Sequence, residues 1–414
     1  MKKLFFLLCF LLIFTTSVAA EPPEVKAPYA ILADTKNNVI LYEKNINDTF
    51  QPGGLSKLMT AIVALESGMD LSQPITADPE LIASCDFSFG NMGVLAKETL
   101  TANDLLGGMM IYDAAEAAEL LAASHPDGRD GFVTLMNEKA TAIGATNTHY
   151  TSAGGYPDEN QHTTAYDQFL IAQYALQNQT LRSIMATQTY VIEPTNRYTQ
   201  TRYLQNTNQF VVKSLDNYSP STIGLKTSYI KGVGYTLSAA ATRNNTTLVC
   251  IVANAPNEGG KNQAYPDVQR LMDYGFGNFR TFRLVTKGEI IDELRINNGR
   301  NTDHILLQAG THLEGGLPID YDPKELVRTI HKEQAKAPIS EGQPVGTLTI
   351  SYQGRTVGEA PLVANESVER DNVKSVTNFL SRVFLSPLFL TPLFLLLACL
   401  IGHMFFVNYK KVNR

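Results

Sequence analysis

Residues 52–60 read Pro-Gly-Gly-Leu-Ser-Lys-Leu-Met-Thr, and an apolar run continues from there to Glu66. The pattern predicts a helix that opens within this stretch. In one class of serine enzymes, a Ser in the first turn of a helix is followed three residues later by a Lys on the same face, which can take the hydroxyl proton. Lys57 is present, but position 54 is Gly. The stretch therefore predicts a catalytic helix without its nucleophile.

Ser56 directly precedes Lys57 and is the first hydroxyl to consider as a substitute. A helix turns by about 100° per residue, so Ser56 points about 200° away from the face of residue 54. It could replace the missing hydroxyl only if the turn were rebuilt. We therefore do not expect Ser56 to act as a nucleophile.

The composition excludes several functions. The chain has 414 residues, 44% of them hydrophobic and 18% charged, which allows two or three domains with a sizeable core. A net charge of −6 without a block of like charges argues against a nucleic-acid partner.

His149 and His162 belong to no cluster with metal-ligand spacing, so we expect no metal and no cofactor. Cys85 and Cys250 do not make a disulfide framework.

The first residues predict export. Residues 1–20 contain a basic start, a short apolar run and small residues up to Ala20, which are the three parts of a secretory signal peptide. Apolar residues recur at helical spacing near the other end and predict a membrane-proximal amphipathic helix at 366–386.

The last residues predict an anchor in the cell membrane. Residues 388–407 form a nearly uninterrupted apolar run, which as a helix would be about 30 Å long and match a bilayer core. Basic residues follow this run at once, including Lys410 and Lys411. We therefore predict a single transmembrane helix at 387–408, a cytoplasmic tail at 409–414 and a main body outside the cell.

The residues around Lys57 resemble a known family. Pro52, Ser56 and the run from Lys57 to Ala61 are similar to the first motif of the D-alanyl-D-alanine carboxypeptidases. These are the low-molecular-weight penicillin-binding proteins, which are serine peptidases of cell-wall peptidoglycan. Everything in the motif matches except the nucleophile, which is replaced by Gly54.

The second motif of that family is also altered. The resemblance implies a proton-relaying Ser and a substrate-binding Asn between two helices, and the matching positions are Asp113 and Ala115. An ionised carboxylate cannot relay a proton as a hydroxyl does, and Ala115 has nothing to donate to a substrate amide. Asp113 could also be no more than an acidic N-cap of the helix that follows.

The third motif of the family is Lys-Thr-Gly on a strand, where the first two residues hold the carboxylate end of the substrate. Lys226 and Thr227 match it, but the glycine is replaced by Ser228. Alternation along a strand places Lys226 and Ser228 on one face, so Ser228 adds atoms where the family has none. The resemblance thus implies a substrate-binding strand that a substrate cannot approach in the same way as in the family.

Both the pattern and the resemblance favour a two-domain fold. We expect a mixed α/β, penicillin-binding-protein or β-lactamase-like domain at 21–274, in which helices flank an antiparallel sheet, and a small all-β domain at 275–365. In the first domain we predict strands at 29–34, 38–43, 221–228, 234–242 and 246–253, a helix that opens within 52–60 and runs to 66, and helices at 104–123, 129–143 and 164–177. In the second we predict strands at 281–285, 289–294, 304–307, 327–331, 344–352 and 355–361.

The three altered motifs together predict a pseudoenzyme. Loss of a serine nucleophile costs on the order of 10⁶ in kcat, and further losses in the same unit add little. We therefore expect a membrane-anchored homologue that binds a peptidoglycan stem peptide or acts as a scaffold for an envelope protein. The alternative is an active D-alanyl-D-alanine carboxypeptidase that trims stem peptides with Ser56 or Ser228 as its nucleophile.

The retained lysines predict an ion-pair cluster. In the family fold, Lys57 and Lys226 converge on one site, where two ammonium groups without a counter-charge would repel each other. Asp113 occupies the position between them. We predict that Asp113 pairs with Lys57, Lys226 or both.

Overall fold

The structure, a computed structural model, describes residues 21–36, 38–377 and 386–412. The chain divides into two compact units, Met1–Phe282 with Gly316–Asp322 and Arg283–Gly315 with Pro323–Arg414. The predicted signal peptide at 1–20 lies outside the described residues.

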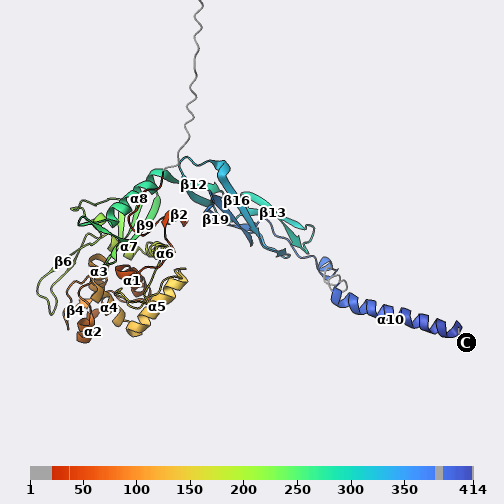
Figure 1. The fold of residues 1–414 in the computed structure, drawn as a ribbon, viewed down its shortest axis with the longest axis horizontal. Coiled ribbons are helices and arrows are strands. Elements are labelled where there is room, and N and C mark those ends of the chain that lie inside the picture. Colours follow the sequence, from red (N-terminus) through yellow and green to blue (C-terminus); the bar gives the residue numbers. More distant parts are fainter. Residues whose placement is uncertain (1–20, 37, 378–385, 413–414) are drawn as a thin grey trace, which may run out of the picture. The chain divides into compact units, whose positions relative to one another are not determined.

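A five-stranded antiparallel sheet with the order β2-β1-β9-β8-β7 forms the centre of the first unit (Figure 1). Two strands come from the start of the unit and three from its end, as predicted. β8 and β9 meet in a tight turn at Asn244 and Asn245, whose φ angles of 49° and 64° suit a two-residue hairpin. The strands are β1 (Tyr29–Asp34), β2 (Val39–Lys44), β7 (Thr222–Ile230), β8 (Gly234–Arg243) and β9 (Thr246–Ala255).

Helices cover both faces of this sheet. α8 packs on β8 and β9, and the core on its side includes Leu32 and Cys250. Ile31 and Ala33 enter the opposite core together with the other main helices, so neighbouring residues of β1 serve different faces. This arrangement confirms the mixed α/β class. The helices are α1 (Ser56–Glu66), α2 (Pro79–Ser84), α3 (Ala102–Tyr112), α4 (Ala115–Ala123), α5 (Gly128–Ala142), α6 (Ala165–Ala175), α7 (Gln179–Met185) and α8 (Ala264–Asn278).

The single helix predicted at 104–123 is wrong. The chain forms two helices, α3 and α4, because Asp113 between them has a left-handed conformation that no α-helix can contain. Short elements that the sequence analysis did not predict complete the unit: the 3-10 turns η1 (Gly53–Leu55) and η2 (Gln209–Val211), and the strands β3 (Pro74–Thr76), β4 (Thr99–Thr101), β5 (Thr189–Ile192), β6 (Arg202–Gln205), β10 (Asn257–Glu258) and β11 (Lys261–Asn262).

The second unit is rich in β-structure, as predicted. Its main sheet has six strands in the order β16-β18-β19-β14-β13-β17, and β12 pairs with β15. β15 and β17 were not predicted. The strands are β12 (Phe279–Val285), β13 (Ile290–Asn297), β14 (His304–Ala309), β15 (Leu313–Pro318), β16 (Leu326–Lys332), β17 (Ala335–Lys336), β18 (Pro344–Tyr352) and β19 (Arg355–Ala364), and the 3-10 turn η3 (Pro323–Glu325) precedes β16.

The C-terminal part is helical. Of the helix predicted at 366–386, residues 372–377 are helical and residues 378–385 lie outside the described residues. The predicted start is wrong, because residues 366–371 are not helical and form isolated β-bridges at Val368 and Arg370. α10 (Pro387–Val412) follows. Among the described residues, none of the helices is both long and apolar enough to cross a membrane, so the transmembrane helix predicted at 387–408 is not confirmed.

Candidate functional site

The candidate site lies where α1, the break between α3 and α4, and strand β7 meet. The turn η1 leads into α1 and brings Lys57 toward this break. The Lys57 side chain is only 3% exposed, and its Nζ lies 3.0 Å from Oδ1 of Asp113. The ammonium group that the sequence assigns to the position of a catalytic base is therefore bound to a carboxylate.

The backbone conformation of Asp113 determines where its carboxylate lies. It ends α3 with φ 66° and ψ 25°, a left-handed conformation that Asp tolerates better than most residues. The N-cap of α4 is Ala114, which offers no side-chain hydrogen bond. The alternative in which Asp113 is an N-cap is therefore wrong, because its carboxylate is turned toward the lysines.

Lys226 reaches the same carboxylate from β7. Its Nζ lies 3.0 Å from Oδ1 of Asp113 and donates to the carbonyl oxygens of Met109 and Met110, at 3.0 and 3.3 Å. These carbonyls belong to the last turn of α3, where unpaired carbonyl groups attract a cation. Burial lowers the pKa of Lys226 to about 8, although the attraction of Asp113 opposes this shift.

Asp113 therefore pairs with both lysines, which confirms the predicted ion-pair cluster. Its side chain is 16% exposed. Burial by itself raises the pKa of the Asp113 carboxyl, but the charges of Lys226 and Lys57 outweigh burial and hold this pKa below its ordinary value. We call Lys57, Asp113 and Lys226 the lysine–aspartate cluster.

Gly54 lies against this cluster without space for a side chain. An ideal Cβ at position 54 would lie 2.7 Å from Oδ1 of Asp113 and 2.7 Å from the carbonyl oxygen of Thr227. Both distances are shorter than real Cβ contacts. The position of the missing nucleophile is thus closed by a carboxylate and by strand backbone.

The third-motif residues are bound within the protein. Ser228 Oγ accepts a hydrogen bond of 2.8 Å from the Gly54 N–H. In serine acyl transfer, the N–H of the nucleophile residue often helps to stabilise the oxyanion. The Thr227 hydroxyl donates to Thr207 Oγ1 at 2.7 Å. Lys226, Thr227 and Ser228, predicted to bind substrate, therefore all have partners inside the chain.

Ser56 lies on the other side of the helix, as predicted. It is fully buried, and its Oγ has no hydrogen-bond partner among the described residues. An ideal Cβ on Gly155 would lie 3.2 Å from the Ser56 Cβ, so this side faces the loop around Gly155. No hydrogen bond among the described residues joins this hydroxyl to the lysine–aspartate cluster.

Ala115 is the first residue of α4, and its N–H donates to the carbonyl oxygen of Gly90 at 2.7 Å.

Two buried glutamates follow Ala115 in α4 and were missed by the sequence analysis. Glu116 Oε1 accepts from the N–H groups of Met92 and Gly93, and burial raises the pKa of Glu116.

Glu119 binds the loop that contains Gly154. Its Oε1 accepts from the Gly154 N–H at 2.7 Å, and its Oε2 pairs with Arg129 at 2.9 Å. The only feature of the sequence that could have indicated these buried glutamates is that two acidic residues, three positions apart, interrupt an otherwise apolar, Ala-rich helix. These carboxylates bind loops and do not reach the lysine–aspartate cluster through any hydrogen bond found among the described residues.

Comparison with known proteins identifies the family. The family model of the D-alanyl-D-alanine carboxypeptidases matches residues 16–257. This chain belongs to that family. A second model, for the C-terminal domain of penicillin-binding protein 5, matches residues 279–370. Both matches agree with the two predicted folds.

Curated carboxypeptidases are similar over most of the chain. The D-alanyl-D-alanine carboxypeptidase DacF of Bacillus subtilis is 24% identical over 83% of this chain and 86% of its own length. DacA of Haemophilus influenzae is 26% identical over 87% of this chain and 91% of its own length. Among solved structures, penicillin-binding protein 5 of H. influenzae has a TM-score of 0.69 at 22% identity, covering 85% of this chain and all of that one, which shows a shared fold.

Proposed function

We propose that this chain is a non-catalytic member of the carboxypeptidase family that binds or organises components of the cell envelope. The similar curated proteins are D-alanyl-D-alanine carboxypeptidases, enzymes of peptidoglycan metabolism. The partner we propose is therefore a peptidoglycan stem peptide or an envelope protein associated with it.

One observation supports the loss of catalysis above all others: Gly54 replaces the nucleophile and has no room for a side chain. The neighbouring groups agree with it. Lys57 is engaged by Asp113, and the Gly54 N–H is taken by Ser228. A reaction would need a hydroxyl, a free base and an available oxyanion donor, and each of these is missing or occupied.

The proposal predicts that no acyl-enzyme forms. We expect the purified full chain to acquire no covalent adduct from a fluorescent penicillin and to release no D-alanine from a pentapeptide. DacA of H. influenzae, treated in parallel, serves as the positive control. Gel fluorescence and mass spectrometry give the readout.

An adduct would contradict the proposal and support the active alternative. In that case the variants Ser56→Ala and Ser228→Ala would show which hydroxyl reacts. Ser228 is the more informative of the two, because its oxygen lies 2.8 Å from the N–H of the former nucleophile position.

We also propose that the chain is anchored in the cell membrane with its main body outside. The support is the sequence itself, namely the apolar run at 388–407 and the basic residues Lys410 and Lys411 after it. Protease added to intact spheroplasts should digest the main body and spare a short C-terminal tag. Digestion of the tag from outside would contradict the proposed orientation.

A further inference from the structure

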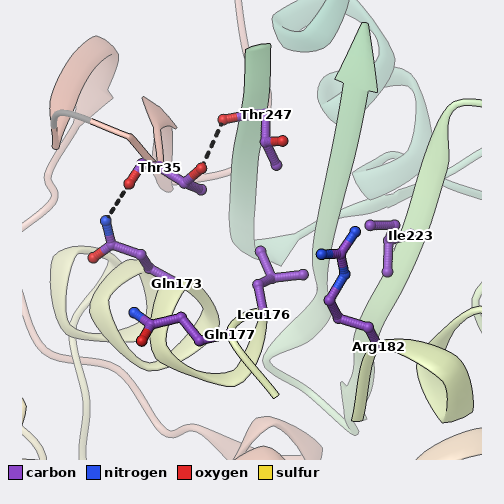
Figure 2. Close-up of a pocket in the computed structure, with 7 residues that line it drawn as sticks. All are labelled: Thr35, Gln173, Leu176, Gln177, Arg182, Ile223 and Thr247. Atoms are coloured by element: carbon purple, nitrogen blue, oxygen red, sulfur yellow. Dashed lines mark hydrogen bonds between the residues drawn. The ribbon is translucent and has the colours of Figure 1, made fainter. Parts of the chain in front are cut away.

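A polar cavity opens in the first unit and shares no lining residue with the lysine–aspartate cluster. Its volume is about 170 Å³, and its wall comes from the end of β1, the starts of β7 and β9, and helices α6 and α7 (Figure 2). Nothing in the proposed envelope role or in the carboxypeptidase motifs uses this cavity. Its chemistry can therefore be considered on its own.

Hydrogen bonds fix one side of the cavity. Thr35 donates to the carbonyl oxygen of Thr247 through both its N–H and its hydroxyl, at 3.0 and 3.1 Å. The Gln173 amide donates to the carbonyl oxygen of Thr35 (Figure 2). It also donates to Oδ1 of Asn38. These bonds tie α6 to the β1 and β9 backbone, so this wall is formed before any ligand binds.

Arg182 supplies the charge of the cavity. It is exposed, and its guanidinium has no ion pair or hydrogen bond with any residue that the structure describes. In the view of Figure 2 the guanidinium reaches between Leu176 and Ile223, two apolar residues of the lining. A guanidinium presents paired N–H donors that match a carboxylate in two parallel hydrogen bonds.

We propose that this cavity binds a small carboxylate that carries an acylamino group, as at the end of a peptide. Arg182 binds the carboxylate, Leu176 and Ile223 contact a short aliphatic side chain, and the exposed Gln177 offers an uncharged donor and acceptor for the amide. The proposal does not depend on whether the lysine–aspartate cluster is catalytic.

The size and the charge of the lining support this class of ligand. A cavity of about 150 Å³ holds a molecule the size of benzene, so the present cavity fits roughly the end residue of a peptide. Arg182 is the one charged residue in the lining, which contains no carboxylate that would attract a cation. A phosphate dianion would keep one charge without a partner, so a monocarboxylate fits better.

Ligand-observed NMR on the full chain tests the proposal. The probes are N-acetyl-D-alanine and N-acetyl-L-alanine, which represent the ends of a stem peptide and of an ordinary protein, with inorganic phosphate as a third probe. We expect at least one acetylalanine to bind at millimolar concentration and more tightly than phosphate. The preferred enantiomer indicates the source of the natural ligand.

Variants decide whether the cavity is the site. Arg182→Gln should weaken binding of the preferred acetylalanine roughly tenfold or more, because it removes a charge-assisted pair of hydrogen bonds. Arg197→Gln, which changes another exposed arginine outside this cavity, should leave binding unchanged. The proposal is overturned if neither acetylalanine binds, if phosphate binds as tightly, or if Arg182→Gln has no more effect than Arg197→Gln.

Discussion

Replacement of Asp113 by Ala is expected to destabilise the first unit strongly. The Lys57 and Lys226 side chains are 3% and 0% exposed, and Asp113 is the shared carboxylate of both. Removal of one partner from a buried ion pair leaves an uncompensated charge and costs about 3–5 kcal/mol. For a unit of this size, that corresponds to a fall in Tm of roughly 6–20 °C, measurable by circular dichroism or calorimetry.

The matched control is Asp273→Ala, which removes the carboxylate of an exposed pair. Arg243 and Asp273 lie 3.5 Å apart with side chains 40% and 60% exposed, so this loss should stay within about 1 kcal/mol. If Asp113→Ala is as stable as the control, the lysine–aspartate cluster has no structural role and an open carboxylate-binding cleft becomes the better hypothesis.

The effect of Asp113→Ala should also depend on pH. Because the pKa of Asp113 is lowered in the folded protein, its contribution to stability is present above its ordinary pKa, near 4, and is lost as the pH falls through the lower folded value. The difference in Tm between the parent and Asp113→Ala should therefore shrink in acid. A difference that stays constant down to acid pH would show that the carboxylate charge is not the cause.

Replacement of Gly54 by Ser, which restores the family's nucleophile, is expected to restore no activity and to reduce stability. The new Cβ would lie 2.7 Å from both the Asp113 carboxylate and the Thr227 carbonyl oxygen. The carboxylate is held by two lysines and the carbonyl belongs to a strand, so neither moves cheaply. Overpacking of this kind costs about 1–3 kcal/mol. The measurements are Tm and fluorescent penicillin labelling.

Gly54→Ala separates the steric effect from the hydroxyl, because it should lower Tm as much as Gly54→Ser. Gly277→Ala is the control: it lies in α8 with nothing within 4 Å of its Cβ position, so it should be neutral or slightly stabilising. Addition of Asp113→Ser to Gly54→Ser should relieve one of the two close contacts. Penicillin labelling of Gly54→Ser alone would show that the cleft adapts more easily than its packing indicates.

Local patterns were enough to predict most of the fold. The hairpin turn at Asn244 and Asn245 and the strands on either side of it depend on neighbours in the chain, so alternation and turn residues reveal them. The direction of Ser56 in the first motif could also be predicted from the sequence. It depends only on the rotation per residue of a helix, which turns Ser56 away from the face of Gly54. The charges of the three residues and their positions in the family's motifs together predicted that Asp113 would pair with the lysines.

The tertiary structure decided what depends on groups far apart in the sequence. The break at Asp113 was invisible to helical periodicity. The Asp113 backbone is left-handed there, and its carboxylate lies between lysines of α1 and β7, which are distant in the sequence. The bond between Ser228 and the Gly54 N–H, the space denied to a side chain at position 54, and the cavity beside Arg182 likewise arise from packing of α1, α7 and the sheet. A sequence pattern reports the preferences of neighbouring residues, whereas the distances between distant elements are set by how their side chains fill the core.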